Sequence, residues 1–162
     1  MKRALFLIWQ FTWGLPQNLF GLIAYLSMRK KCEHKAFGQA IVTYVPVTEK
    51  PFGGISLGMF IFVNPTRPQD WLFDAHIHEY GHTIQSLILG WLYLPLIGVP
   101  SFLWCNLKPV IRWRKENNRS YYWLYCEGWA NRLGAWAGKT DFVSEELLAR
   151  GNYNKPFTQK YS

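Results

Sequence analysis

The chain has 162 residues, a formal net charge of +8 and an aromatic content of 18%. Only 17% of its residues are charged, against about 25% in a typical soluble domain. This composition excludes a disordered chain, which needs many charges and few aromatic residues, and a coiled coil, which is rich in Ala, Glu, Lys, Leu and Arg. The length predicts a single domain over 1–162, and the basic, aromatic-rich composition favours a membrane surface.

The N-terminal segment is apolar, because positions 4–28 contain no charged residue. Pro16 in its middle predicts two helices, 3–14 and 16–28, rather than one straight span. The segment is flanked by five basic residues: Lys2, Arg3, Arg29, Lys30 and Lys31. We therefore expect an apolar helical hairpin over 3–29 in the membrane interface, with both ends on the cytoplasmic side of a bacterial-type inner membrane. A buried core hairpin of a globular protein is the alternative.

Two runs nearer the middle of the chain have the composition of strands. Residues 39–47 and 55–64 are rich in β-branched and aromatic side chains, and the turn-forming residues Pro51, Gly53 and Gly54 separate them. The sequence therefore predicts that these two runs pair as a β-hairpin. With helices predicted on both sides of the hairpin, the expected fold class is α+β and mainly helical.

Helical periodicity returns after the strands. The apolar spacing predicts one helix over 69–90, a second over 118–138 and a short one over 142–150, followed by a polar tail at 152–162. A second uncharged run, 83–107, is long enough to span a membrane. Four helix-breaking residues interrupt it, so a straight span is not expected: Gly90, Pro95, Gly98 and Pro100.

A basic patch follows this second uncharged run. It consists of Lys108, Arg112, Arg114, Lys115 and Arg119, with Trp113 among them. Nucleic acid is one partner for such a patch. Because apolar runs adjoin every basic cluster of the chain, anionic lipid headgroups are the favoured partner, and no nucleic acid is expected.

The helix predicted over 69–90 carries the motif HExxH, as His78-Glu79-Tyr80-Gly81-His82. Residues four apart lie on one helical face, so the two imidazoles can bind one metal ion. Glu79 then lies beside the metal-bound water, whose pKa a zinc ion lowers toward 7, and its carboxylate can take the proton. The alternative is an ordinary helix that contains two unrelated histidines.

A catalytic zinc ion needs a third protein ligand and an open fourth position. Five acidic residues follow the motif: Glu116, Glu127, Asp141, Glu145 and Glu146. Glu127 is the best candidate, because it lies among Tyr, Trp and Ala on a predicted helix, where an unpaired charge is costly to bury. A metal would compensate that charge, and Arg132 is the alternative partner. Asn131, one turn further on, can accept a hydrogen bond from the free ring N–H of a zinc-binding histidine.

HExxH followed on a later helix by Glu-x-x-Ala-Asn resembles the gluzincin class of zinc metallopeptidases. The nearest pattern is the ExxAD of membrane-bound endopeptidases, among them the prenyl-protein (CAAX) processing enzymes and the heat-shock membrane proteases. The resemblance implies that His78, His82 and Glu127 hold zinc (Zn2+), and that Glu79 is the general base and later the proton donor. Asn131 matches the aspartate that this family places behind a zinc histidine, and as a neutral amide it would polarise the histidine less.

The resemblance also implies a zincin-like fold with a small β-hairpin or sheet beside the HExxH helix. Zincins commonly run an edge strand there, to which an extended substrate adds as a further strand. The run 55–63 is the candidate for this strand, and Gly58 within it suits close backbone approach. Gly81 costs the helix about 1 kcal/mol, which a tight contact with this strand or with the later helix would explain.

These expectations combine into a membrane-associated zinc metalloendopeptidase that hydrolyses a peptide or protein substrate. A site-2-type intramembrane protease is a second possibility, but its third ligand is an Asp in a downstream membrane segment, and Asp141 lies in a polar stretch. A third is a non-enzymatic, peripheral membrane-binding module whose metal site is structural or absent. A structural zinc has four protein ligands, for which His34 or His76 is available. Candidate donors to the oxyanion of peptide hydrolysis are Tyr121, Tyr122, Tyr125 and Arg132.

Overall fold

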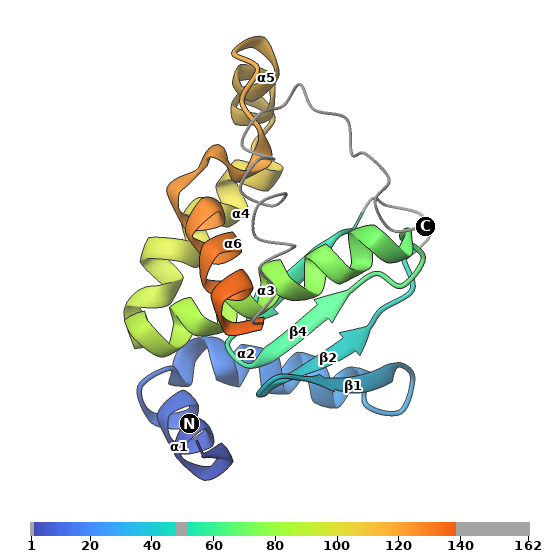
Figure 1. The fold of residues 1–162 in the computed structure, drawn as a ribbon, viewed down its shortest axis with the longest axis vertical. Coiled ribbons are helices and arrows are strands. Elements are labelled where there is room, and N and C mark those ends of the chain that lie inside the picture. The colour runs from blue at the N-terminus through green and yellow to red at the C-terminus, as the bar shows by residue number, and fades with distance from the viewer. Residues whose placement is uncertain (1, 48–51, 139–162) are drawn as a thin grey trace.

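The computed structural model describes residues 2–47 and 52–138 (Figure 1), and the helix and tail predicted over 142–150 and 152–162 lie outside them. The first half contains α1 (Arg3–Thr12), α2 (Leu15–Met28), β1 (Glu33–Phe37), β2 (Ala40–Tyr44), β3 (Gly54–Leu57) and β4 (Phe60–Val63). The second half contains α3 (Gln69–Leu89), the short helical turns η1 (Gly90–Leu92) and η2 (Leu94–Gly98), α4 (Val99–Asn106), α5 (Lys108–Glu116), η3 (Tyr121–Trp123) and α6 (Tyr125–Gly138). The fold is α+β and mainly helical, as predicted.

The four strands form one mixed sheet in the order β1-β2-β4-β3. β2 and β4 pair in parallel, with Ile41 opposite Phe60, so the predicted hairpin between 39–47 and 55–64 is wrong. The second run instead folds back on itself, and β3 and β4 are antiparallel with Leu57 opposite Phe60. Gly58 begins the two-residue loop between them with a φ of +67°, a conformation that glycine adopts without strain. The chain therefore reverses at the residue that was expected to lie within a strand.

The core consists of two layers of apolar side chains, one on each face of the sheet. β4 has all four side chains buried, and they alternate: Ile61 and Val63 pack toward α3, whereas Phe60 and Phe62 pack with Phe6 of α1 and with α2. A continuous apolar run is typical of a strand covered on both faces. The sheet thus lies between the N-terminal helices and α3 (Figure 1).

The N-terminal hairpin has the predicted break, because α1 ends at Thr12 and Pro16 lies in the first turn of α2. The second uncharged run is also broken as expected, since α3 ends at Leu89 and the next residue, Gly90, has a φ of +58°. Among the described residues, no helix is by itself long and apolar enough to cross a membrane. One pair, Leu94–Asn106 with Lys108–Glu116, meets that requirement only when taken together, and it is bent by 75°.

The helix predicted over 118–138 begins later than expected, at Tyr125. Asn118 takes the left-handed conformation with a φ of 51° just after the unpredicted helix α5, and the η3 turn then precedes α6. Asparagine tolerates this conformation better than most residues. A left-handed residue at position 118 ends α5, and the chain does not become helical again until η3 and α6. The shorter α6 still contains both Glu127 and Asn131.

Glycines bring α3 and α6 into contact at two points. A Cβ on Gly81 of α3 would lie 1.8 Å from the carbonyl oxygen of Ala130, and a Cβ on Gly134 of α6 would lie 2.0 Å from that of Ile77. Neither position has room for a side chain, because the obstacle is backbone in both cases. The tight contact predicted for Gly81 is therefore confirmed, with the later helix as the partner.

We expect Gly81→Ala to destabilise the protein by about 3 kcal/mol or more, since the two helices must separate to admit the methyl group. Gly98→Ala is the matched control, because its Cβ would make ordinary contacts of 3.4 Å and 4.0 Å in a helical segment. Chemical denaturation followed by circular dichroism measures both. Equal stability of the two variants would contradict the close packing of α3 and α6.

Candidate metal centre

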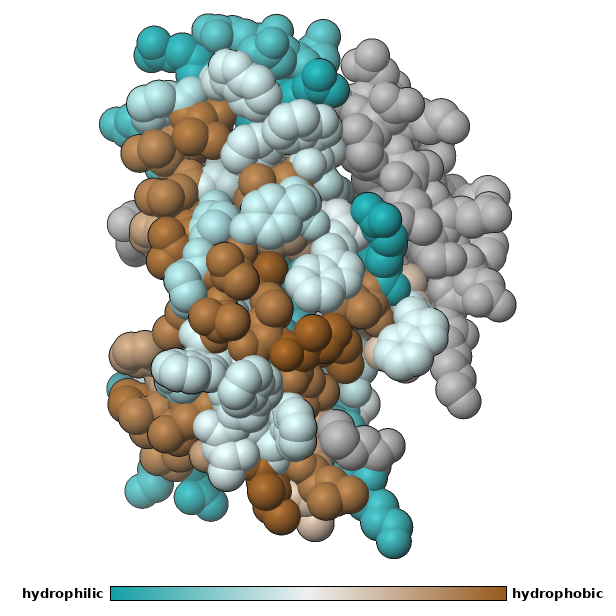
Figure 2. All heavy atoms as spheres, turned by 90° about the vertical axis from the view of Figure 1, so that its left-hand side faces the viewer, coloured by the Kyte–Doolittle hydropathy of each residue, from teal (hydrophilic) through white to brown (hydrophobic). Residues whose placement is uncertain are grey.

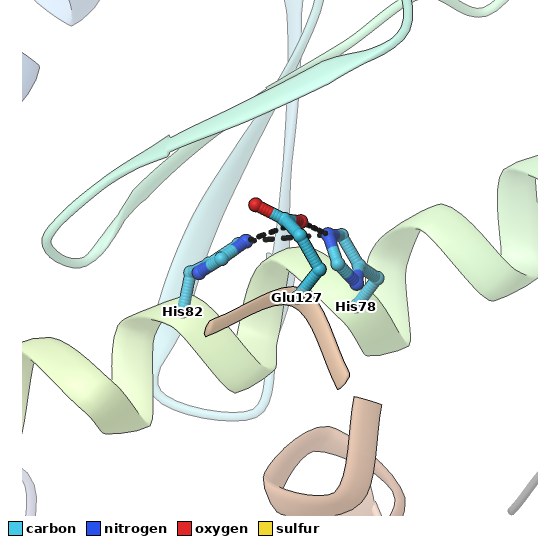
Figure 3. Close-up of side chains that lie close together, drawn as sticks. All are labelled: His78, His82 and Glu127. Atoms are coloured by element: carbon cyan, nitrogen blue, oxygen red, sulfur yellow. Dashed lines mark hydrogen bonds and ion pairs between the residues drawn. The ribbon is translucent and has the colours of Figure 1, made fainter. Parts of the chain in front are cut away.

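Two helices bring the three predicted ligands together. His78 and His82 lie one turn apart on α3 with ring centroids separated by 4.7 Å, and Glu127 reaches them from the first turn of α6 (Figure 3). The Glu127 Oε2 atom is 3.0 Å from His78 Nε2 and 3.5 Å from His82 Nε2, and the two Nε2 atoms are 3.2 Å apart. All three residues are buried. The ligand atoms lie within 4.8 Å of one another, so the group could hold one metal ion.

The other ring nitrogen of each histidine contacts a buried amide oxygen. Asn131 Oδ1 is 2.6 Å from His78 Nδ1, as expected, and Gln85 Oε1 is 2.7 Å from His82 Nδ1. Gln85 Nε2 donates to the Cys126 carbonyl, which can only accept, so the amide oxygen must face His82. His82 Nδ1 therefore donates to Gln85, and in both histidines Nε2 is the nitrogen that faces Glu127.

Gln85 was not predicted. The sequence does contain a weak signal for it, because a polar, uncharged residue three positions after His82 lies on nearly the same face of an apolar helix. Its side chain is fully buried, where an unbonded amide would be costly. The hydrogen bonds to His82 and to the α6 backbone satisfy that requirement and connect the two helices at the site.

The arrangement of the three ligand atoms suits a metal cation. Two imidazole nitrogens and a carboxylate oxygen converge, with His78 Nε2 and His82 Nε2 both at ion-pair distance from Glu127 Oε2. Burial by itself raises the pKa of Glu127, but the charge and hydrogen bonding of His82 and His78 outweigh this effect and hold the pKa well below its ordinary value. The alternative partner, Arg132, instead donates from Nε to the Gly128 carbonyl at 3.4 Å. Two histidines and a carboxylate are a donor set typical of zinc.

Glu79 lies beside this group and against the sheet. A Cβ on Gly54 of β3 would be 2.6 Å from Glu79 Oε1, so only glycine lets the carboxylate approach the strand. Burial raises the pKa of Glu79 to about 7, an effect that His78 reduces and Glu127 increases. β3 is an edge strand, whereas β4 is internal, so the predicted edge strand over 55–63 is correct only for its first part.

Tyr93, which follows η1, is a further residue of the site that sequence reasoning missed. Its side chain is buried, and its hydroxyl donates to the Ser56 carbonyl of β3 at 3.4 Å. Burial, and then the charges of Glu79 and Glu127, raise the pKa of its hydroxyl well above the ordinary value. Tyr93 therefore connects the segment after α3 to the edge strand.

Of the four candidate oxyanion donors predicted from the sequence, two lie beside the metal centre and two make contacts elsewhere. The rings of Tyr121 and Tyr122 lie beside His78, with centroids 6.2 Å and 5.2 Å from its ring. The Tyr125 hydroxyl instead donates to the Leu96 carbonyl, so it is directed away from the group. Arg132 is also engaged elsewhere, as described above.

The two other histidines, considered above as a fourth ligand, lie in separate surroundings. His76 stacks on Phe37 and contacts the Tyr44 hydroxyl at 3.2 Å, and burial lowers its pKa. His34 Nδ1 contacts the Thr43 hydroxyl of the neighbouring strand at 2.9 Å. Neither belongs to the group of possible ligands found in the described part of the chain.

Comparison with known proteins adds no relative, since no protein-family model, curated protein or solved structure matches the chain. The class of the site is therefore defined by its own chemistry. It is a buried candidate metal centre with two imidazole ligands, one carboxylate ligand and a second carboxylate next to them.

Proposed function

We propose that this chain is a gluzincin-type zinc metallopeptidase with a zincin-like arrangement of helix and edge strand. More specifically, we infer a membrane-associated metalloendopeptidase that hydrolyses peptide bonds. The observation that carries the proposal is the convergence of His78 Nε2, His82 Nε2 and Glu127 Oε2, with the Glu79 carboxylate next to them. Three protein ligands leave a fourth position open, as catalytic zinc sites do.

Each residue of the site has a role in this reaction. Zinc, when bound, supplies Lewis-acid chemistry that polarises the peptide carbonyl and lowers the pKa of water. Glu79 accepts the proton of the attacking water at its carboxylate and returns it to the leaving amine nitrogen. β3 is an edge strand and lies against Glu79 at Gly54, which supports binding of an extended peptide as an additional strand. Tyr121 or Tyr122, whose rings lie beside His78, is the candidate to donate a hydrogen bond where negative charge develops on the substrate.

The direct test is metal content together with cleavage. Protein purified in the presence of zinc should contain about one zinc ion per chain by elemental mass spectrometry, and it should cleave members of a peptide library. Chelation should stop cleavage and added zinc should restore it. His78→Ala should lose the metal. His34→Ala should retain it, because the His34 ring contacts Thr43 of β2 rather than the metal centre. Zinc content well below one per chain in the unaltered protein would refute the proposal.

The amides behind the histidines give a more sensitive test. We expect Gln85→Leu and Asn131→Leu each to weaken zinc affinity about 10- to 100-fold, since each removes the acceptor that holds one imidazole in its ligand tautomer. Competition with a fluorescent chelator measures the affinity. Gln39→Leu, on the loop between β1 and β2, is the matched control and should bind zinc as the unaltered protein does. Unchanged affinity in both amide variants would mean that the amides do not hold the histidines in a ligand tautomer.

A further inference from the structure

The two uncharged runs of the sequence, 4–28 and 83–107, come together on one side of the fold. The ring of Trp13 packs edge-on against Trp91 with centroids 6.4 Å apart, and the Trp9 indole N–H donates to the Leu87 carbonyl at 2.9 Å. These contacts join the N-terminal segment to the last turn of α3 and to η1, which follows it. Neither run contains a charged residue, so the combined surface has none from either segment.

Large apolar side chains project from both halves of this surface, which we call the apolar face. Six of the most exposed, each 54–63% accessible, are Ile8, Phe20, Ile23, Trp91, Val99 and Phe102. Figure 2 shows apolar residues spread over the centre of this side of the molecule. Large exposed apolar patches are rare on soluble monomers and mark interaction sites, so the apolar face is a candidate interaction surface.

The ends of the apolar face are basic. Lys108, Arg112 and Lys115 are exposed and follow one side of α5, the helix at the top of Figure 1, and Figure 2 shows hydrophilic residues at this end. Lys2 and Arg3 lie at the start of α1, near the opposite end of the molecule. An apolar surface bounded by cationic side chains is complementary to a bilayer that carries anionic headgroups.

A cluster of three tryptophan rings, with an arginine over one of them, lies where α4, α5 and η3 meet. The Trp104, Trp113 and Trp123 rings are in mutual contact, and the Arg119 guanidinium lies 5.0 Å from the centre of the Trp123 ring. Tryptophan is enriched at the level of lipid headgroups, because its ring is apolar and its N–H is polar. The aromatic cluster therefore marks the boundary between the acyl region and the headgroups.

The lengths of the helices determine how deeply the apolar face can insert. α1 and α2 have 10 and 14 residues, so they are about 15 Å and 21 Å long, which is less than the roughly 30 Å of a bilayer core. The break between them prevents a continuous span. For α1 and α2, insertion into a single leaflet is the mode that these lengths favour.

We propose that the apolar face docks on an anionic phospholipid bilayer, inserted into one leaflet, with α5 against the headgroups. This extends the membrane-associated part of the proposed function and does not depend on the metal. Flotation with vesicles tests it: the protein is synthesised cell-free with vesicles of phosphatidylcholine alone or with phosphatidylglycerol added. We expect flotation with the anionic vesicles to exceed that with the neutral ones and to weaken with added salt.

Two pairs of variants locate the contact. Arg112→Gln/Lys115→Gln should weaken partition to anionic vesicles about 30-fold, since each basic side chain near the surface contributes about fivefold. Lys35→Gln/Arg67→Gln removes the same charge away from the apolar face and should change partition by less than about twofold.

Ile23→Ser/Phe102→Ser should weaken partition to both vesicle types by about tenfold or more per side chain, whereas Ile55→Ser on β3 should not.

Three outcomes would overturn the proposal. The first is that the protein does not float with anionic vesicles. The second is that Ile23→Ser/Phe102→Ser floats as the unaltered protein does while circular dichroism shows both to be folded. The third is that light scattering shows an oligomer that this double variant dissociates, which would make a second copy the occupant of the face. Because flotation needs no cleavage and can be repeated after zinc is chelated, its failure is distinct from failure of the peptidase activity.

Discussion

Glu79→Gln is expected to bind zinc as the unaltered protein does and to lose peptide cleavage by a factor of about 10² to 10⁴. Glutamine keeps the shape of the side chain and its fit against Gly54, but an amide oxygen cannot take the proton that hydrolysis must transfer. Elemental mass spectrometry measures the zinc, and kcat/KM on one cleaved peptide measures the activity. Loss of activity with the metal retained separates the role of Glu79 from the roles of the ligands.

The matched control is Glu116→Gln at the exposed end of α5, which removes the same charge away from the metal centre. It should leave both zinc content and cleavage of a soluble peptide unchanged. If Glu79→Gln kept full activity, another group would have to be the base, and the assignment of HExxH chemistry would be wrong. If it lost the zinc as well, Glu79 would be a ligand rather than a base.

Glu127→Gln should reduce zinc affinity by more than the about 10- to 100-fold expected for the amides behind the histidines, because it removes a ligand directly. The carboxylate is fully buried beside both Nε2 atoms, and the neutral amide that replaces it is a poor zinc ligand. Competition with a fluorescent chelator measures the affinity. A cooperative unfolding transition, measured in the absence of metal, shows that the variant is folded.

Asp141→Asn provides the comparison that decides between the two enzyme classes. Asp141 lies outside the described residues, and it is the third ligand that a site-2-type protease would require. We expect Asp141→Asn to bind zinc with unchanged affinity, because Glu127 already lies with the two histidines. The reverse result, with Asp141→Asn losing the metal and Glu127→Gln keeping it, would support the site-2-type alternative.

Local patterns in the sequence predicted most of the helices, though not α5 or the start of α6, and most of the site. The four-residue spacing of His78 and His82 determines that they share a face of α3, whatever the rest of the fold does. Burial of Glu127 and its approach to the histidines were also predictable, because few acidic residues follow the motif and this one lies in an apolar helix. Asn131 follows by the same helical spacing, and its contact with His78 is confirmed.

Strand pairing could not be predicted in the same way. The pairing of β2 with β4 is parallel and links residues about 20 positions apart, so no local turn signal specifies it. Gly58 is compatible with a bulge, a close approach or a turn, and only the reversal of the chain between β3 and β4 selects the turn. The edge strand beside the helix is accordingly shorter than the run from which it was predicted.

By itself the sequence determined which residues could be ligands and base, because helical spacing is a local property and acidic residues are scarce after the motif. Only the tertiary structure decided that α3 and α6 approach within backbone contact at Gly81 and Gly134, which carries Glu127 to the histidines. It also decided that Gln85 and Tyr93 belong to the site, and that two distant uncharged runs form one surface. The physical reason is that these features depend on contacts between distant segments, which the packing of the whole chain selects.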